Sequence, residues 1–185
     1  HGLRVIDLTR VVAGPFCTMM LGDMGAEVLK IEEPQHGDDS RAWAPYIHGW
    51  GSFYLALNRS KKSVALDLKS AAGAEALTRL VETADVLIEN FRPGSLAELG
   101  FDYLSVSALN PRLIYCSISG YGQTGPHAQL PIAPEPCAGK AVVDRYAIGR
   151  CRRRIPRLAQ IERVLDAVLV SARRFERHRR RQIAG

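Results

Sequence analysis

The start of the chain alternates between apolar runs and a helical pattern, which limits the folds it can adopt. An apolar run covers residues 3–8, and a turn ending in Ala13-Gly14-Pro15 follows it. A second apolar run covers residues 26–31, directly after Gly25. This strand–helix–strand unit predicts a parallel sheet, whose ligand lies where the first strand turns into the helix. The turn at residues 10–15 lacks the glycine spacing of a dinucleotide fingerprint.

The same alternation continues to residue 130. Apolar runs predict three more strands, at residues 64–68, 85–90 and 113–119, and helical patterns lie between them. Near-continuous apolar strands joined by helices indicate a parallel sheet that is covered on both faces. We therefore predict an α/β fold: a Rossmann-like, doubly wound and mostly parallel sheet over residues 1–130, followed by an Arg-rich helical tail.

Composition changes abruptly after Leu130. Residues 1–130 hold 11 Lys and Arg against 14 Asp and Glu, whereas residues 131–185 hold 14 against 5. Apolar residues from Leu158 recur at spacings of three and four, which predicts an amphipathic helix near residues 157–182. We interpret residues 131–185 as an atypical Pro/Arg-rich segment. It is either an abnormal, out-of-frame ending or a selected helix that covers a face, pairs with another chain or binds an acidic partner.

Bulk properties indicate a soluble globular protein. The chain has 185 residues and is 46% hydrophobic, and no apolar run approaches the length of a membrane span. The four cysteines form no C-x-x-C pair and have no histidine at zinc-ligand spacing. We therefore predict no metal site and free thiols in a reducing compartment. No secretory signal is visible, so we expect a cytoplasmic location, with a mitochondrial one left open.

Two motifs match a dinucleotide-binding site in residue type but not in structural context. Gly120-x-Gly122-x-x-Gly125 has the fingerprint spacing, but Pro126 follows where a helix must begin to bind the pyrophosphate. It is either a flexible loop beside a site or a tight turn, and an NAD-dependent oxidoreductase is disfavoured. Glu32-Glu33 ends the second strand, and we interpret these acids as solvated residues before a proline turn.

Two other clusters have both a functional and an ordinary interpretation. Arg59, Lys61 and Lys62 precede the third strand and suit a phosphorylated ligand, although short charge runs are usually solvated surface. The residues Asn90-Phe91-Arg92 follow the fourth strand, at the edge where open sheets bind ligands. Phe91 either stacks on a base or is buried beside a simple turn.

Six ordered motifs together carry a family resemblance. They are Val5-Ile6-Asp7-Leu8-Thr9 with Ala13-Gly14-Pro15, Leu21–Val28 with Lys30-Ile31-Glu32, Gly37-Asp38-Asp39-x-Arg41, Asn58–Ser63, Glu89–Gly94 and Ser119–Pro126. On these motifs, residues 3–128 resemble the family III CoA-transferases, which include formyl-CoA transferase and succinate–hydroxymethylglutarate CoA-transferase. The racemase of 2-methylacyl-CoA thioesters shares the fold.

The resemblance implies an enzyme that moves CoA between an acyl-CoA thioester and a carboxylic acid, here a dicarboxylate. CoA would be a substrate, not a permanently bound cofactor, and family members form homodimers. The residues that match the family's site motifs fall into four groups. They are Val11 and Ala13 for the adenine or pantetheine path, Arg59, Lys61 and Lys62 for the phosphates, Asn90, Phe91 and Arg92 for the nucleotide end, and Gly120, Tyr121, Gly122 and Gln123 beside the acyl group.

The chain departs from the family at the catalytic aspartate. Asp144 and Asp166 are the only aspartates after Leu130, and neither lies in the family's surrounding motif. The catalytic residue is therefore unassigned, and we expect a truncated fragment with weak or absent transferase activity on its own. The alternatives are a 2-methylacyl-CoA racemase-like enzyme and a basic helical module that binds nucleic acid or an anionic membrane.

Overall fold

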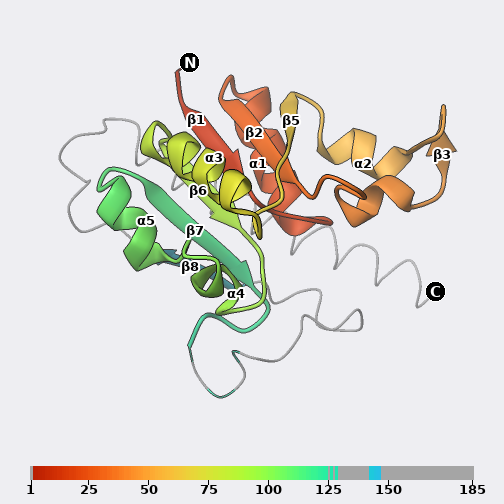
Figure 1. The fold of residues 1–185 in the computed structure, drawn as a ribbon. Helices are drawn as coiled ribbons and strands as arrows, with labels where there is room; N and C mark the ends of the chain where they lie inside the picture. Colours follow the sequence, from red (N-terminus) through yellow and green to blue (C-terminus); the bar gives the residue numbers. More distant parts are fainter. Residues whose placement is uncertain (1, 125, 127, 129–141, 147–185) are drawn as a thin grey trace.

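A six-stranded, mostly parallel sheet forms the centre of the protein (Figure 1). The computed structural model describes residues 2–124, 126, 128 and 142–146. The strands are β1 (Arg4–Asp7), β2 (Glu27–Glu32), β5 (Lys61–Ala65), β6 (Val86–Glu89), β7 (Ile114–Ser119) and β8 (Val142–Tyr146). Their order in the sheet is β5-β2-β1-β6-β7-β8, with β8 antiparallel to β7 and the other neighbours parallel. The predicted α/β fold with a mostly parallel sheet is therefore confirmed, and the predicted Arg-rich helical tail lies outside the described residues.

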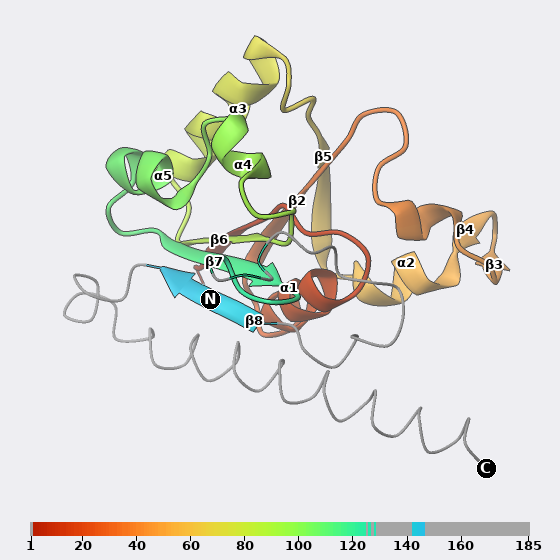
Figure 2. The ribbon, with the colours of Figure 1, turned by 90° about the horizontal axis from the view of Figure 1, so that it is seen from below.

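Helices cover both faces of the sheet, as a doubly wound fold requires. Helix α1 (Ala13–Asp23) lies on one face, and α3 (Ala71–Glu82), α4 (Ser95–Glu98) and α5 (Tyr103–Leu109) lie on the other (Figure 2). Between β2 and β5 the chain makes an excursion away from the sheet. This excursion comprises a 3₁₀ turn η1 (Asp39–Ala42), a small hairpin of β3 (Tyr46–Ile47) and β4 (Trp50–Gly51), and helix α2 (Ser52–Leu57).

Alternation along each strand divides the core into two layers. Val5, Val28 and Val86 pack with Cys17 and Leu21 on the α1 face. The intervening residues pack against α3, α4 and α5 on the opposite face, and include Ile6, Leu29, Leu87, Leu77 and Val106. Because successive strand side chains point to opposite faces, a strand buried on both sides has to be apolar throughout. Each fully buried side chain of this kind stabilises the fold by about 1.5–3 kcal/mol.

The strand order reverses between β1 and β6. The chain winds from β1 outward to β2 and β5, then returns to place β6 on the other side of β1. The loops that leave the carboxyl ends of β1 and β6 therefore diverge to opposite faces. In folds of this class the expected ligand position, which we call the crevice, lies where these loops diverge. These are the β1–α1 loop, residues 8–12, and the β6–α4 loop, residues 90–94.

Three details differ from the sequence-based predictions or lie beyond the description. The third predicted strand begins at Lys61 instead of Val64, because residues 61–65 pair with β2 from Val28↔Lys61 to Glu32↔Ala65. Strand β8 was not predicted, and it extends the sheet beyond residue 130 through its pairing with β7. The amphipathic helix predicted near residues 157–182, which contains Asp166, lies outside the described residues.

Candidate functional site

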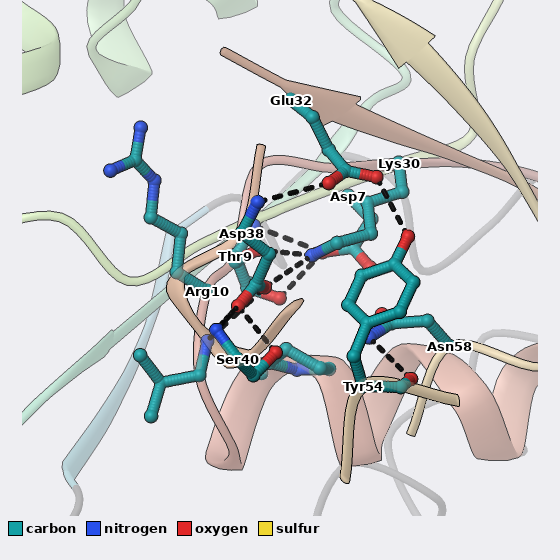
Figure 3. A network of polar contacts seen from close by, with 12 residues as sticks. Asp7, Thr9, Arg10, Lys30, Glu32, Asp38, Ser40, Tyr54 and Asn58 are labelled. Atoms are coloured by element: carbon teal, nitrogen blue, oxygen red, sulfur yellow. Dashed lines mark hydrogen bonds and ion pairs between the residues drawn. The ribbon is translucent and has the colours of Figure 1, made fainter. Parts of the chain in front are cut away.

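The sheet face toward α1 changes from apolar to charged at the carboxyl ends of β1 and β2. Asp7 ends β1, Lys30 lies beside it on β2, and Lys61 reaches Asp7 from the start of β5. Lys61 Nζ lies 3.0 Å from Asp7 Oδ2, and Lys30 Nζ lies 2.9 Å from Asp38 Oδ2. All four side chains are at most 1% exposed. Figure 3 shows Asp7, Lys30 and Asp38 of this network beside Thr9 and Arg10.

Asp7 is fully supplied with donors. Its carboxylate accepts from the Thr9 amide at 2.9 Å and from Thr18 Oγ1 at 2.6 Å, in addition to Lys61. Burial on its own would raise the pKa of Asp7, but the ammonium groups of Lys61 and Lys30 and the two threonine hydroxyls lower it overall. Burial lowers the pKa of Lys61, and the Asp7 carboxylate opposes that shift. Asp7 is therefore a carboxylate held in the ionised form.

A second buried cluster surrounds Glu32, and it corrects the prediction that this acid is solvated. Glu32 accepts two hydrogen bonds from Arg41, one from Tyr54 and one from Ser63, and its side chain is 4% exposed. Burial opposes ionisation here too, but these donors lower the pKa of Glu32 to about 2. The prediction was wrong because Arg41 and Tyr54 come from the excursion, which folds back over the end of β2.

The β1–α1 loop is held in an unusual conformation by these groups. Lys30 Nζ donates to the Thr9 carbonyl at 2.8 Å, and the Asp38 carboxylate accepts from the Val11 amide at 3.3 Å. Val11 has φ of 71°, in the left-handed region. That region is unfavourable for a β-branched residue and persists only where the surroundings impose it. Such strain is typical of functional loops.

Asn90 joins this loop to the β6–α4 loop across the crevice. Its side-chain Oδ1 accepts from the Arg10 amide at 2.9 Å, and its Nδ2 donates to the Arg10 carbonyl at 2.9 Å. The side-chain amide is therefore bound to backbone in this structure. The two loops that flank the reversal in strand order are held together by one residue.

Phe91 is half-buried, which lies between the two interpretations offered for it. Its ring packs against the apolar layer below α4, and the Arg10 guanidinium lies 5.9 Å from the ring centroid. Its amide donates to the buried Glu89 carboxylate at 2.8 Å. Burial raises the pKa of Glu89, against the hydrogen bonds from Ser117 and the Phe91 amide. Arg92, the next residue, is exposed.

The three cations predicted to face the phosphates of CoA do not converge on one point. Arg59 pairs with Asp23 at 2.7 Å, Lys61 pairs with Asp7, and Lys62 pairs with Glu27 at 2.8 Å. Lys61 and Lys62 are consecutive strand residues and therefore point to opposite faces. Three other cations follow strands at the carboxyl edge and form no ion pair with any described residue. They are Arg10, Lys69 and Arg92.

The glycine loop leaves the carboxyl end of β7, beside the β6–α4 loop. Gly122 has φ of 89°, and its amide donates to Ser119 Oγ at 2.9 Å. Residues 120–124, which include Tyr121 and Gln123, form bends and no helix, as expected for a loop that is not a dinucleotide fingerprint. Gly125 lies outside the described residues. Ala13 begins α1 on the other side of the crevice and is half-buried.

The described part of the chain contains no group of three or more His, Cys, Asp or Glu residues that could hold a metal ion. None of its helices combines the length and apolar character needed to cross a membrane.

Comparison with known proteins identifies the family. Residues 1–133 match CoA-transferase family III, and the chain belongs to that family. It is 52% identical over 136 residues to succinate–glutarate CoA-transferase of Agrobacterium fabrum, a match that covers 70% of this chain and 34% of the relative. It is 50% identical over 130 residues to human succinyl-CoA:glutarate CoA-transferase, covering 70% of this chain and 30% of the relative.

Solved structures agree with the sequence comparison. The fold matches a CAIB/BAIF family protein from Brucella suis with a TM-score of 0.67 and 46% identity, over 70% of this chain and 35% of that one. The chain spans about a third of the length of the relatives it matches.

The sequence indicated the loops but not the side chains that support them. Lys30, Asp38 and Arg41 occur in the family motifs, but the sequence alone indicates no structural role for them. The available signal was a lysine inside an otherwise apolar strand, since an isolated buried lysine requires a partner. Arg10 and Lys69 had a simpler signal, because each follows a predicted strand within four residues or so of its end.

Proposed function

We propose that this chain carries the CoA-binding part of an enzyme that transfers CoA between an acyl-CoA thioester and a carboxylic acid. The observation that carries the proposal is the reversal in strand order, where the strained β1–α1 loop, Arg10 and Arg92 lie at the carboxyl edge of the sheet. Cations at this edge suit the phosphates of a nucleotide carrier, since guanidinium groups bind phosphate through paired hydrogen bonds. Membership of CoA-transferase family III supports the same reaction class.

The acceptor we propose is a dicarboxylate. Relatives at 44–52% identity are named for transfer among succinate and glutarate, acetyl-CoA and oxalate, and succinyl-CoA and L-malate or D-citramalate. No observation in the structure favours the racemase alternative. We assign the catalytic carboxylate to no described side chain, because the side chains of Asp144 and Asp166 both lie outside the described part of the structure.

The predicted site residues outside the Arg59, Lys61 and Lys62 group keep a place in this proposal. Val11 and Ala13 border the crevice from the α1 side, and Phe91 and Arg92 border it from the β6 side. Asn90 acts by holding the Arg10 backbone, because its amide is already bound there. The glycine loop, residues 120–123, would flank the acyl group. For the phosphates, the geometry favours Arg10 and Arg92 over Arg59, Lys61 and Lys62, which are engaged by carboxylates.

Calorimetric titration of the full chain with CoA and succinyl-CoA tests this function. We expect binding and a raised melting temperature, because a ligand that binds only the native state stabilises it. Loss of one charge-assisted hydrogen-bonding group costs about 1.5–3 kcal/mol, so Arg92→Ala or Arg10→Ala should weaken binding roughly tenfold or more. Arg79→Ala, which removes the same charge from an exposed pair on α3, is the matched control.

Two results would count against the proposal. A wild-type chain that binds neither CoA nor succinyl-CoA at millimolar concentration contradicts the function itself. Binding that depends on Arg59 or Lys62 and not on Arg10 or Arg92 contradicts the placement and restores the earlier phosphate prediction. The same samples, measured by light scattering, test the homodimer that the family resemblance predicts.

A further inference from the structure

The buried pair of Lys30 and Asp38 reaches beyond itself to the backbone of the β1–α1 loop. Lys30 Nζ lies 2.9 Å from Asp38 Oδ2 and donates to the Thr9 carbonyl at 2.8 Å. The Asp38 carboxylate in turn accepts from the Val11 amide at 3.3 Å. The two charges therefore hold the two peptide groups on either side of Arg10. A buried backbone group outside regular structure needs such a partner.

Net stability does not explain a pair of this kind. Desolvation of two buried charges offsets most of their attraction, and apolar residues of similar volume often stabilise a fold equally well. An apolar pair, however, would leave the Thr9 carbonyl and the Val11 amide without partners. The positive group faces the carbonyl and the negative group faces the amide, so the polarity of each charge matches the group it holds.

The resulting conformation of the β1–α1 loop directs the Arg10 side chain toward the crevice. With its amide held by Asp38, Val11 keeps a φ of 71°. The Arg10 side chain then points away from the buried network, as Figure 3 shows, while the Arg10 backbone meets Asn90. Arg10 thus stays on the crevice side, where its guanidinium lies over the Phe91 ring.

We infer that Lys30 and Asp38 are positioning residues, which set the shape of the β1–α1 loop on which binding of the CoA thioester depends. The inference rests on the proposed function. Neither side chain touches the ligand, because both are fully buried beneath the loop. Asp38 also caps the η1 turn by accepting from the Ser40 amide at 2.9 Å, so the pair connects the excursion to the loop.

The double variant Lys30→Met, Asp38→Asn separates positioning from stability. It removes both charges, leaves an amide oxygen near Val11 and Ser40, and avoids the unpaired buried lysine that Asp38→Asn alone would create. Asn110→Ala is the matched control, because Asn110 is equally buried and donates to Val81 and Ala84 carbonyls at the opposite edge of the sheet. Both variants are compared with the wild type by CoA titration and by hydrogen exchange of residues 8–12.

We expect the folded double variant to bind CoA at least tenfold more weakly and to exchange residues 8–12 at least tenfold faster. Asn110→Ala should lower the melting temperature and leave both the affinity and the loop exchange unchanged. A folded double variant with wild-type affinity and wild-type loop exchange would overturn the inference, as would faster exchange without loss of affinity. A wild-type chain that fails to bind CoA contradicts the proposed function. Unchanged exchange of residues 8–12 in the double variant contradicts, independently, the inference that Lys30 and Asp38 hold the β1–α1 loop.

Discussion

At the scale of single residues, Lys61 and Lys62 show that a local run of charges does not predict the role of each side chain. The two lysines are adjacent, and nothing in the sequence distinguishes them. Lys61 lies on the α1 face, 1% exposed, and its Nζ contacts Asp7, Asn58 and the Pro15 carbonyl. Lys62 lies on the other face, 70% exposed, and pairs with Glu27. Side-chain alternation along β5 makes one lysine part of the core and leaves the other at the surface.

The two lysines should therefore differ in their contribution to stability. Lys61→Met leaves Asp7 buried without its closest cation, and breaking a buried pair in this way costs about 3–5 kcal/mol. Lys62→Met removes an exposed pair, which is worth about 0–1 kcal/mol. Urea unfolding of both variants measures the difference in the free energy of unfolding. Equal losses would show that Lys61 is not buried against Asp7.

Glu32 should make the fold sensitive to acid. Its folded-state pKa of about 2 lies below the ordinary value of 4.5. A depressed pKa contributes stability that is complete above pH 4.5 and is lost as the pH falls toward 2. The full contribution is on the order of 3 kcal/mol, since each pKa unit corresponds to about 1.4 kcal/mol.

Unfolding measured between pH 6 and pH 2.5 tests this dependence. The wild type should lose stability more steeply than Glu32→Gln across this interval, although the variant is less stable at pH 6. Glu75→Gln, on an exposed helical pair, is the control and should follow the wild-type slope. Parallel curves for wild type and Glu32→Gln would mean that the Glu32 carboxylate is not held as described.

Residue burial was the part of the site that sequence reasoning could not supply. Asp7 and Lys61 are 54 positions apart, and Glu32 meets Tyr54 across 22. A charged residue in a strand pattern indicates that a partner is needed but does not identify it. The partners of Asp7 and Glu32 become known only when β5 and the excursion are placed, and this is why the solvated interpretation of Glu32 failed.

At the scale of elements, the packing of α1 on β1 depends on one glycine. An added Cβ at Gly14 would overlap the Thr9 side chain, whereas one at Gly22 of the same helix would meet the Ser60 carbonyl at 3.1 Å. Thr9 cannot move freely, because its amide and carbonyl are held by Asp7 and Lys30. The first turn of α1 therefore approaches the strand end more closely than any side chain allows.

Gly14→Ala and Gly22→Ala should change the free energy of unfolding by different amounts, although both replace glycine by alanine in the same helix. Overpacking of a rigid site costs about 1–3 kcal/mol, while Ala gains about 1 kcal/mol over Gly within a helix. Gly14→Ala should thus destabilise the fold by up to about 2 kcal/mol, and Gly22→Ala should remain near neutral. Chemical denaturation compares the two. A Gly14→Ala variant as stable as the wild type would contradict the close approach of α1 to Thr9.

Element prediction succeeded where periodicity was strong. The strands at the start of the chain and after α3 and α5 follow from near-continuous apolar runs. Ser70 caps α3 by accepting a hydrogen bond from the Gly73 amide. The start of β5 was missed because Lys61 and Lys62 look like a polar loop. An edge strand with one exposed face tolerates such residues. Strand β8 was missed because its neighbours are rich in proline and arginine.

At the scale of the whole molecule, strand order explains why the predicted loops lie together. The segments after β1, β6 and β7 are far apart in the sequence, but the parallel sheet places all three at its carboxyl edge. The sequence could predict this edge, since the rule depends only on parallel strands. It could not predict that the Asn90 side chain joins the β1–α1 and β6–α4 loops, because that contact depends on the backbone conformation at Arg10.

Hydrogen exchange of the full chain, with and without CoA, tests the central claim most directly. The account predicts that CoA slows exchange in residues 8–13 and 90–94, the two loops at the reversal in strand order. The opposite edge offers a built-in comparison, a hollow of about 350 Å³ lined by Arg4, Glu27, Thr83 and Asp85 among others. Protection confined to that edge, with the two loops unchanged, would contradict the account.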